Sequence, residues 1–330
     1  MQFQGQQRLD FYKDILLCRS IDDALVDIYW EGKRPIFSFA AGPLPGELHS
    51  SRGQEPVGVG VCGALGPDDL ITTGHRPHHV ALARGVDPKR MVAEILGKST
   101  GLSGGVGGHM HLYDPSVNFS SSGIIAEGMG PVAGMAMARK MQGQPGIGVS
   151  FIGDAAVNQG AFHEVLNLVS LFKIPFICVV EDNKWGVTTS KAESTIIERN
   201  SDRAANYGMV GEFVTGNDVE AIYEAALRAV ARAREENKAT LLEIETVRLD
   251  GHFIGDPAGY ITGERKTYQV DPIPVYRRKL MDAGVLNDAL DARIAAEVKA
   301  ITDEAIRFGL ESPYPEEAAA FRNVFAPALG

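Results

Sequence analysis

The chain has 330 residues, of which 45% are hydrophobic and 22% are charged. Such a chain can bury a large core, and its length favours one main α/β domain with a helical tail. Its 32 basic and 42 acidic side chains give a net charge of −10, and no basic run occurs. This balance argues against nucleic acid and anionic membranes as partners.

The N-terminal segment, residues 1–8, has no apolar run of the kind that directs export. No stretch of the chain approaches the roughly 18 apolar residues that a membrane span needs. The three cysteines, Cys18, Cys62 and Cys178, lie far apart in apolar contexts, as reduced core cysteines do. We therefore expect a cytoplasmic protein.

The first predicted element is an amphipathic helix over residues 9–30, and Gly32 ends it. A loop rich in Pro and Gly follows over 34–46. Residues 58–63 match the Gly-x-Gly-x-x-Gly pattern of dinucleotide-binding folds. The residues before them are too polar for the strand that this motif requires, so we predict a closely packed helix there instead of an NAD site.

A small-residue stripe is predicted next along one helix, at positions Ala126, Gly130, Gly134 and Ala138. The stripe permits close contact with another helix, either at a subunit interface or inside one subunit, and both alternatives stay open. Glu127 lies beside it, and we favour a packing or interface role for this acid over a catalytic one.

A β-α-β unit follows. The apolar run at 147–152 predicts a buried parallel strand, and Asp154 comes directly after it. Asn is a favoured N-cap, so a helix is predicted to start near Asn158. Residues 176–180 predict a second buried strand, which leads to Asn183.

The carboxyl ends of parallel strands meet at one edge of a sheet, where ligands bind, so Asp154 and Asn183 are predicted to lie close together. Carboxylate and amide oxygens suit Mg²⁺, and a helix N-terminus beside them attracts phosphate groups. Each residue alone also fits an ordinary cap or turn. Together they predict a metal and diphosphate site.

The remaining elements are a helix over 219–235, a strand over 240–247 and two helices near 272–283 and 287–309. We therefore predict an α/β fold with a central, mostly parallel sheet and helices on both faces. The predicted organisation is an N-terminal helix and loop (1–45), an α/β domain (46–270) and a C-terminal helical extension (271–330).

Six of the eight histidines fall within one fifth of the chain, at His49, His75, His78, His79, His109 and His111. They lack the accompanying cysteines and the helical i, i+4 spacing that zinc sites favour. Imidazoles that line a polar channel fit better, because they pass protons and bind carbonyl groups near neutral pH, although some of them can be structural.

Taken together, the motifs have a family resemblance that runs from about residue 10 to the C-terminus. Beside the Gly153-Asp154 and Asn183 elements, the matching segments are 52–55 (RGQE), 73–79 (TGHRPHH), 107–111 (GGHMH), 123–125 (GII) and 250–253 (DGHF). The chain resembles the alpha subunit of the thiamine-diphosphate-dependent first component of 2-oxo acid and acetoin dehydrogenase complexes. The resemblance implies the thiamine-diphosphate-binding fold.

The resemblance also implies roles for individual residues. Mg²⁺ would be bound by Asp154, Asn183 and the backbone carbonyl of Trp185. The diphosphate would be held by Arg76, His252, Gly153, Ala155 and Ala156, and the aminopyrimidine by Gly123 and Ile125. The candidate catalytic imidazoles are His75, His78, His109, His111 and His252.

Two departures from the family pattern affect the site. Ala155 stands where the family has glycine, and if that position needed a positive φ the strain would be about 1–2 kcal/mol. Val106 and His109 stand where the family has Arg and Ser, which removes a cation and adds an imidazole near the expected substrate channel.

The implied activity is that of an alpha subunit which works with a beta subunit in an α₂β₂ assembly. The enzyme would cleave acetoin or decarboxylate a pyruvate-like 2-oxo acid and pass the acyl group to a lipoyl acyltransferase. Segments 251–256 and 311–315 favour acetoin. The alternatives are a transketolase-like carbon-fragment transferase and a non-catalytic assembly subunit of the same fold.

Overall fold

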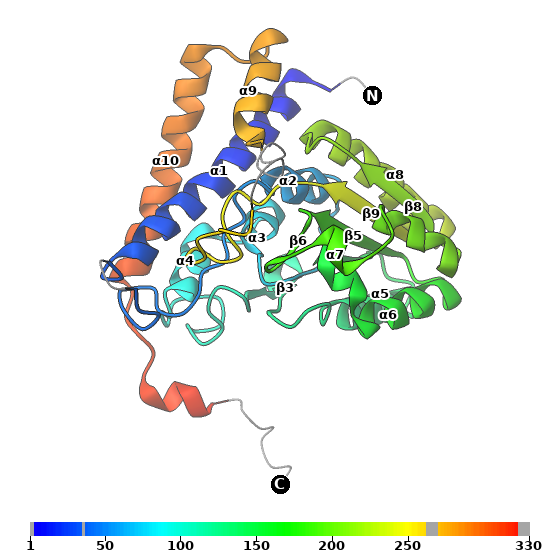
Figure 1. Cartoon of the computed structure of the whole chain (residues 1–330), viewed down its shortest axis with the longest axis horizontal. Coiled ribbons are helices and arrows are strands. Elements are labelled where there is room, and N and C mark those ends of the chain that lie inside the picture. Colours follow the sequence, from blue (N-terminus) through cyan, green and yellow to red (C-terminus); the bar gives the residue numbers. More distant parts are fainter. Residues whose placement is uncertain (1–2, 35–36, 262–269, 323–330) are drawn as a thin grey trace.

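The computed structural model describes residues 3–34, 37–261 and 270–322. Its centre is a seven-stranded sheet with the order β2-β3-β1-β4-β5-β9-β8 (Figure 1). Neighbouring strands are parallel except for the pair β2–β3. The strands are β1 (Leu70–Thr73), β2 (Tyr113–Asp114), β3 (Phe119–Ser121), β4 (Gly148–Gly153), β5 (Phe176–Asp182), β8 (Val210–Val214) and β9 (Thr240–Glu245), with a separate ribbon of β6 (Trp185–Gly186) and β7 (Thr189–Ser190).

Helices surround this sheet. The α-helices are α1 (Gly5–Trp30), α2 (Glu55–Gly63), α3 (His78–Arg84), α4 (Pro88–Ile95), α5 (Met129–Met141), α6 (Gly160–Leu171), α7 (Lys191–Ser194), α8 (Val219–Glu236), α9 (Pro272–Asp282) and α10 (Asp288–Glu311). Short 3-10 helices are η1 (Pro115–Val117), η2 (Asp154–Asn158), η3 (Asn200–Tyr207) and η5 (Glu317–Phe321). Among the described residues, no helix combines the length and apolar character that crossing a bilayer requires.

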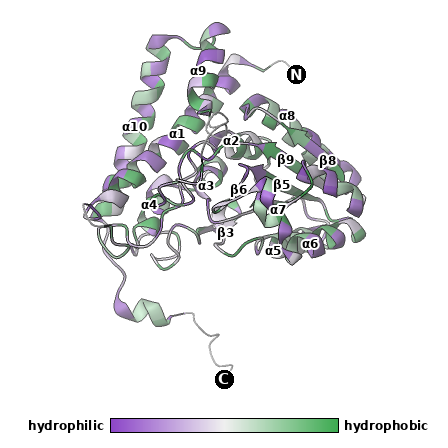
Figure 2. Ribbon diagram, in the orientation of Figure 1, coloured by the Kyte–Doolittle hydropathy of each residue, from purple (hydrophilic) through white to green (hydrophobic). Residues whose placement is uncertain are grey.

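Strand β5 shows why the sheet is covered on both faces. All seven of its residues are buried. Ile177 and Val179 pack in one cluster with α1, α2 and α8, whereas Cys178 and Val180 pack in a second cluster with α5 and α6. Successive side chains of a strand point to opposite faces, so both faces need apolar cover. The outer helices α8 and α10 mix hydrophobic and hydrophilic residues, as one-sided burial requires (Figure 2).

The predicted β-α-β unit is confirmed. Strands β4 and β5 pair in parallel, and Gly153 lies opposite Glu181 in the register. The helix of this unit, α6, begins at Gly160, near the predicted start, but Asn158 is not its N-cap because it belongs to the 3-10 helix η2 that follows the strand. The long predicted helices are found as α1, α8, α9 and α10, residues 58–63 lie in α2, and the last predicted strand is β9. The boundaries at 45/46 and 270/271 stay a prediction.

The predicted small-residue stripe is only partly helical. Ala126 precedes α5 and has a φ of +62°, so the expectation that it belongs to the helix is wrong. Gly130, Gly134 and Ala138 lie on the exposed side of α5. A Cβ atom at either glycine would meet nothing within 4 Å. This face of α5 is therefore open and not packed inside the subunit.

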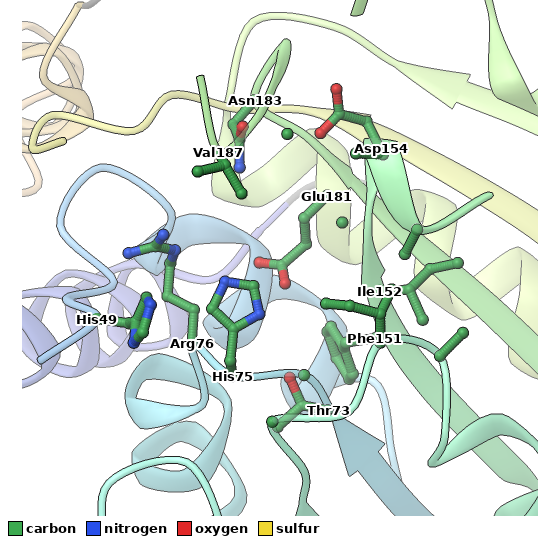
Figure 3. A pocket seen from close by; sticks show the side chains of 18 of the residues that line it. His49, Thr73, His75, Arg76, Phe151, Ile152, Asp154, Glu181, Asn183 and Val187 are labelled. Carbon is green, nitrogen blue, oxygen red and sulfur yellow. The ribbon is translucent and has the colours of Figure 1, made fainter. Parts of the chain in front are cut away.

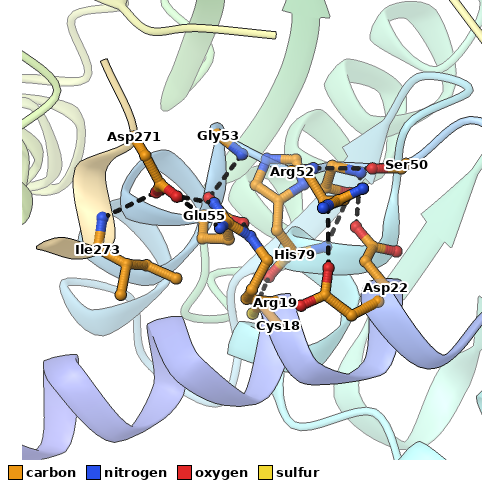
Figure 4. Close-up of polar contacts among 12 residues, drawn as sticks. Cys18, Arg19, Asp22, Ser50, Arg52, Gly53, Glu55, His79, Asp271 and Ile273 are labelled. Carbon is orange, nitrogen blue, oxygen red and sulfur yellow. Dashed lines mark hydrogen bonds and ion pairs between the residues drawn. The ribbon is translucent and has the colours of Figure 1, made fainter. Parts of the chain in front are cut away.

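Helix α1 holds the neighbouring segments that begin α2 and α9 through ion pairs (Figure 4). Its Arg19 donates to Glu55 at 2.6 Å and to Asp271 at 2.9 Å. Glu55 is fully buried, and Asp271 is the N-cap of α9. One guanidinium therefore joins α1 to the first turns of both α2 and α9.

A second acid of α1 supports the polypeptide that carries the histidines. Asp22 accepts hydrogen bonds from the Ser51 backbone N–H and from His78 Nδ1, both at 2.6 Å. Burial opposes ionisation of this carboxyl group, but the two donors outweigh burial, and the pKa of Asp22 lies below its usual value. Helix α1 thus positions the segment at 49–55 and the start of α3.

We predict that Arg19→Met strongly destabilises the fold, because it leaves the buried Glu55 carboxylate without its cation. The expected loss in the free energy of unfolding is about 3–5 kcal/mol, measured by urea denaturation. Lys13→Met on the same helix is the matched control. Lys13 and Glu297 form an exposed pair, whose loss should leave the free energy of unfolding nearly unchanged. Equal effects of the two substitutions would contradict this assignment.

Candidate active site

A cavity of about 680 Å³ opens at the carboxyl ends of β1, β4 and β5 (Figure 3). Eleven of the predicted site residues line it: His75, Arg76, Gly123, Ile125, Gly153, Asp154, Ala155, Ala156, Asn183, Trp185 and His252. The structure thus brings together segments that are up to 177 residues apart in sequence, from position 75 to position 252. This is the strand edge where an open parallel sheet binds ligands.

Asp154 is the most unusual group of this cavity. Its side chain is 2% exposed, and neither carboxylate oxygen has a hydrogen-bond partner. Burial, and then the neighbouring Asp182 carboxylate, raise the pKa of Asp154 to about 7. A buried carboxylate without donors is costly, and a divalent cation would satisfy both oxygens at once. The residue therefore fits the predicted metal site.

Asn183 lies at the same end of the cavity as Asp154 (Figure 3). Its Oδ1 accepts the Trp185 backbone N–H at 3.1 Å, and its Nδ2 donates to Gln54 Oε1 at 3.0 Å. The amide oxygen is thus directed to the loop that also carries the Trp185 carbonyl group. Together with the Asp154 carboxylate, the Asn183 amide oxygen and the Trp185 carbonyl oxygen are the three metal ligands that the family resemblance implies.

Ala155 occupies its backbone position without the strain that a positive φ would cause. It lies in η2 and is absent from the non-glycine residues with positive φ. Room for its methyl group comes from Gly186, where an added Cβ would lie 2.5 Å from the Ala155 Cβ. The chain therefore accommodates alanine here because the facing residue in the β6–β7 ribbon is glycine.

Arg76 supplies a buried positive charge. Its side chain donates to the backbone carbonyl oxygens of Ser50 and, at 2.9 Å, of His252. Burial and the nearby Arg248 guanidinium lower the pKa of Arg76 to about 10, which still leaves it charged at neutral pH. A fixed cation at the wall of the cavity suits an anionic ligand.

Three imidazoles, of His49, His75 and His252, surround this guanidinium. Nitrogen atoms of the three rings lie within 4.8 Å of one another. Burial and the charge of Arg76 hold the pKa of His75 well below its ordinary value and lower that of His252 to about 4. The rings are therefore neutral at pH 7 and act as hydrogen-bonding groups.

The sequence spacing of these residues does not reveal that they converge. Three neutral imidazoles can in principle ligate a transition metal. A second divalent cation at this point would, however, face the guanidinium of Arg76, which shares a wall with the rings. The combination of one fixed cation and three uncharged donors favours an anion, such as a phosphate group.

The other three predicted catalytic histidines lie outside the cavity lining. His109 is buried, and its Nε2 shares a 2.9 Å hydrogen bond with His49 Nδ1. His78 is fully buried against Asp22 of α1. His111 is exposed, and its ring lies beside Gly123. His109 is thus connected to the cavity through His49, whereas His78 lies behind the cavity and His111 at its rim.

The cavity is also lined by residues that are not among the predicted site residues, and these include His49, Gln54, Thr73, Glu181 and Arg248. Gln54 belongs to a segment that carried the family resemblance, so its motif was the available signal. Glu181 is the last residue but one of a buried strand, a position at which a charged side chain is unexpected. Glu127, in contrast, bonds to the Ser122 hydroxyl outside the lining, and Val106 is 64% exposed.

We predict that His109 makes the fold sensitive to acid. Burial, and then His78 and Arg76, lower the pKa of His109 to about 3, whereas an unfolded histidine titrates near 6.5. The unfolded chain therefore binds a proton between these pH values that the folded chain does not, and stability falls as the pH decreases.

In His109→Ser, the free energy of unfolding should decrease less steeply between pH 6.5 and pH 4, by up to about 1.4 kcal/mol per pH unit. Urea denaturation at several pH values measures this slope. Values at pH 8, where the imidazole is neutral in both states, correct for the change in packing. Identical slopes in the two proteins would refute the prediction.

Comparison with known proteins agrees with this geometry. The family described as Dehydrogenase E1 component matches residues 37–318. The alpha subunit of acetoin:2,6-dichlorophenolindophenol oxidoreductase from Bacillus subtilis (strain 168) is 35% identical over 97% of this chain and 94% of that protein. Its counterpart from Cupriavidus necator is 38% identical over 84% of both chains. The pyruvate dehydrogenase E1 component subunit alpha of Rickettsia bellii is 32% identical over 97% of this chain and 96% of that protein.

The family model covers every segment that carries the resemblance, and the three relatives match 84–97% of the chain. The parallel sheet with helices on both faces agrees with the fold that the resemblance implied. The resemblance is therefore confirmed, and the chain belongs to the dehydrogenase E1 component family of thiamine-diphosphate-dependent oxidoreductases.

Proposed function

We propose that this chain is the alpha subunit of a heteromeric dehydrogenase that acts on acetoin or a 2-oxo acid and transfers the resulting acyl group to a lipoyl acyltransferase. The observation that carries the proposal is the buried Asp154 carboxylate, which has no donor within the described part of the chain and lies beside Asn183 at the strand ends. This arrangement calls for a metal ion, and the cavity has room for a large cofactor.

The proposed Mg²⁺ ligands are Asp154 Oδ, Asn183 Oδ1 and the backbone carbonyl of Trp185. All three would offer hard oxygen atoms from the same end of the cavity, and such ligands suit Mg²⁺ beside a phosphate group. A bound Mg²⁺ would keep the Asp154 carboxyl group ionised, although burial alone raises its pKa.

The diphosphate would lie between this metal and Arg76. His75 and His252 are neutral donors on the same wall, and the backbone N–H groups of Ala155 and Ala156 point from the start of η2. The adjoining Gly153 has no side chain, which lets the phosphates approach the end of β4. Charge-assisted hydrogen bonds from Arg76 would supply much of the binding energy.

The aminopyrimidine would lie against Gly123 and Ile125, which line the opposite part of the cavity. Thiamine diphosphate, when bound, supplies a carbon nucleophile and accepts the electron pair released when a carbon–carbon bond of the substrate breaks. The chain's own task is to orient the groups. His49 would hydrogen-bond the substrate carbonyl oxygen, and His109 would set which nitrogen of His49 carries the proton.

A beta subunit is proposed as the obligate partner, in an α₂β₂ assembly. Among the described residues, the acids that line the cavity are Glu47, Asp154 and Glu181. Asp154 lies at the metal end, and Glu181 faces the His79 ring. The resemblance implies that the glutamate that would activate the aminopyrimidine comes from the beta subunit. The open face of α5, with its glycines and the exposed Met135 and Met141, offers a surface for a neighbouring subunit.

Acetoin is the proposed substrate. Two relatives of 35% and 38% identity are named for acetoin, and the pyruvate relative is 32% identical. The chemistry of the cavity supports this choice. The imidazoles of His49, His75 and His252 are uncharged and offer hydrogen bonds rather than charge to a substrate. Acetoin is uncharged and needs only hydrogen bonds.

We predict that Asp154→Ala abolishes binding of thiamine diphosphate with Mg²⁺, because the substitution removes the charged metal ligand. Isothermal calorimetry on the chain together with its beta subunit measures binding. Asp68→Ala, an exposed loop acid away from the cavity, is the control and should bind as the parent does. Normal cofactor binding by Asp154→Ala would refute the proposed metal site.

The substrate proposal is tested by assaying the α and β chains together with 2,6-dichlorophenolindophenol as the electron acceptor. We expect dye reduction with acetoin at a kcat/KM at least tenfold above that with pyruvate or branched-chain 2-oxo acids. Faster turnover of a 2-oxo acid would overturn the assignment to acetoin. Sugar-phosphate turnover without dye reduction would indicate a transketolase-like transferase instead.

A further inference from the structure

Beneath the proposed metal site, four side chains form a continuous hydrogen-bonded row. His79 Nε2 lies 2.7 Å from Glu181 Oε1, and Gln54 Nε2 donates to the same oxygen at 3.0 Å. At its other end, Gln54 Oε1 accepts from Asn183 Nδ2 at 3.0 Å. Gln54 and Glu181 are 2% and 5% exposed, so water does not compete for these bonds.

The row has a fixed direction, which follows from the chemistry of its end. An ionised carboxylate accepts hydrogen bonds and cannot donate them. The NH₂ group of Gln54 must therefore face Glu181. In this orientation the amide oxygen of Gln54 faces Asn183. That oxygen can only accept, so Asn183 must turn its own NH₂ group to Gln54. The Asn183 oxygen is left to face the Trp185 backbone N–H and the metal end of the cavity.

We propose that Gln54 is a positioning residue. Its hydrogen bond to Glu181 fixes the orientation of its own amide, and this amide in turn holds the Asn183 oxygen toward the metal. The inference rests on the proposed metal site. The amide of an asparagine can bind in either of two orientations, and Gln54 selects the one in which the oxygen faces the metal. Side chains behind metal ligands fix ligand orientation in this way, and losing one typically costs about 10–100-fold in metal affinity.

The backbone around Gln54 is built to hold it at this point. Gly53 has a φ of +96°, and a Cβ there would lie 2.6 Å from the Val247 carbonyl oxygen, so only glycine fits. The Gly53 carbonyl group accepts from Asn217 Nδ2 at 2.8 Å, and its N–H donates to Glu55 Oε2 at 2.8 Å. Gln54 is thus fixed on both sides before α2 begins.

The test measures Mn²⁺ binding by electron paramagnetic resonance, with the chain, its beta subunit and thiamine diphosphate present. Gln54→Met keeps the length of the side chain and removes its hydrogen bonds, and we expect the Mn²⁺ dissociation constant to rise about tenfold or more. Gln54→Glu keeps an oxygen that accepts from Asn183 Nδ2, so the Asn183 oxygen still faces the metal end of the cavity. We expect it to bind within about threefold of the parent.

A double-mutant cycle separates orientation from general damage to the fold. In Asn183→Asp both side-chain oxygens are acceptors, so orientation no longer matters. Adding Gln54→Met to this variant should change the Mn²⁺ dissociation constant less than about twofold. Equal losses in both backgrounds, or equal weakness of Gln54→Met and Gln54→Glu, would overturn the inference. If the parent protein itself binds no Mn²⁺, the proposed function fails, which is a distinct result.

Discussion

The parallel pairing of β4 with β5 is the constraint on which the site depends. Its register sets Gly153 opposite Glu181, so that Asp154 and Asn183 leave the sheet at the same edge. A slip by one residue would turn every side chain of a strand to the other face, and the two apolar faces of β5 would then lose their matching clusters. Core packing thereby fixes the positions of the polar groups at the strand ends, although none of those groups belongs to the core.

Charge is distributed unevenly between the surface and the cavity. The protein carries a net charge of −10, yet Arg76 and Arg248 line a cavity whose histidines are held neutral by burial and by these same cations. Field lines concentrate in such a cleft, because its walls have a low dielectric constant. The opposing carboxylates are kept at the metal end or paired with His79. Two buried guanidinium groups thus face an anionic ligand inside a molecule whose net charge is negative.

Much of the fold could be predicted because its long elements carry a strong local signal. Helices α1, α8 and α10 have an uninterrupted apolar period, and β4 and β5 are apolar runs bounded by Asp154 and Asn183. Strand β1 was missed, since Leu70–Thr73 is only four residues long and follows two aspartates. The turn at Ala126 could not be predicted, because small residues at helical spacing give no indication that one of them has a positive φ.

Within the site, the residues that could be found from sequence were those in recognisable motifs. The contact of His49 with His109 joins positions 60 apart, and that of Gln54 with Glu181 joins positions 127 apart. No local pattern encodes such contacts, because tertiary packing alone creates them. Even so, a charged residue inside a run that is otherwise apolar, as at Glu181, marks a place where burial must be compensated by a partner.

The facing pair of Ala155 and Gly186 has a consequence for the way this loop can change. Only one of the two positions has space for a methyl group, since Cβ atoms on both would lie 2.5 Å apart. An exchange of the two residues must therefore pass through the glycine–glycine intermediate, and the opposite order passes through a clash. The order of the two substitutions therefore matters. A library that varies both positions at once can reach the exchanged pair without passing through the clashing alanine–alanine combination.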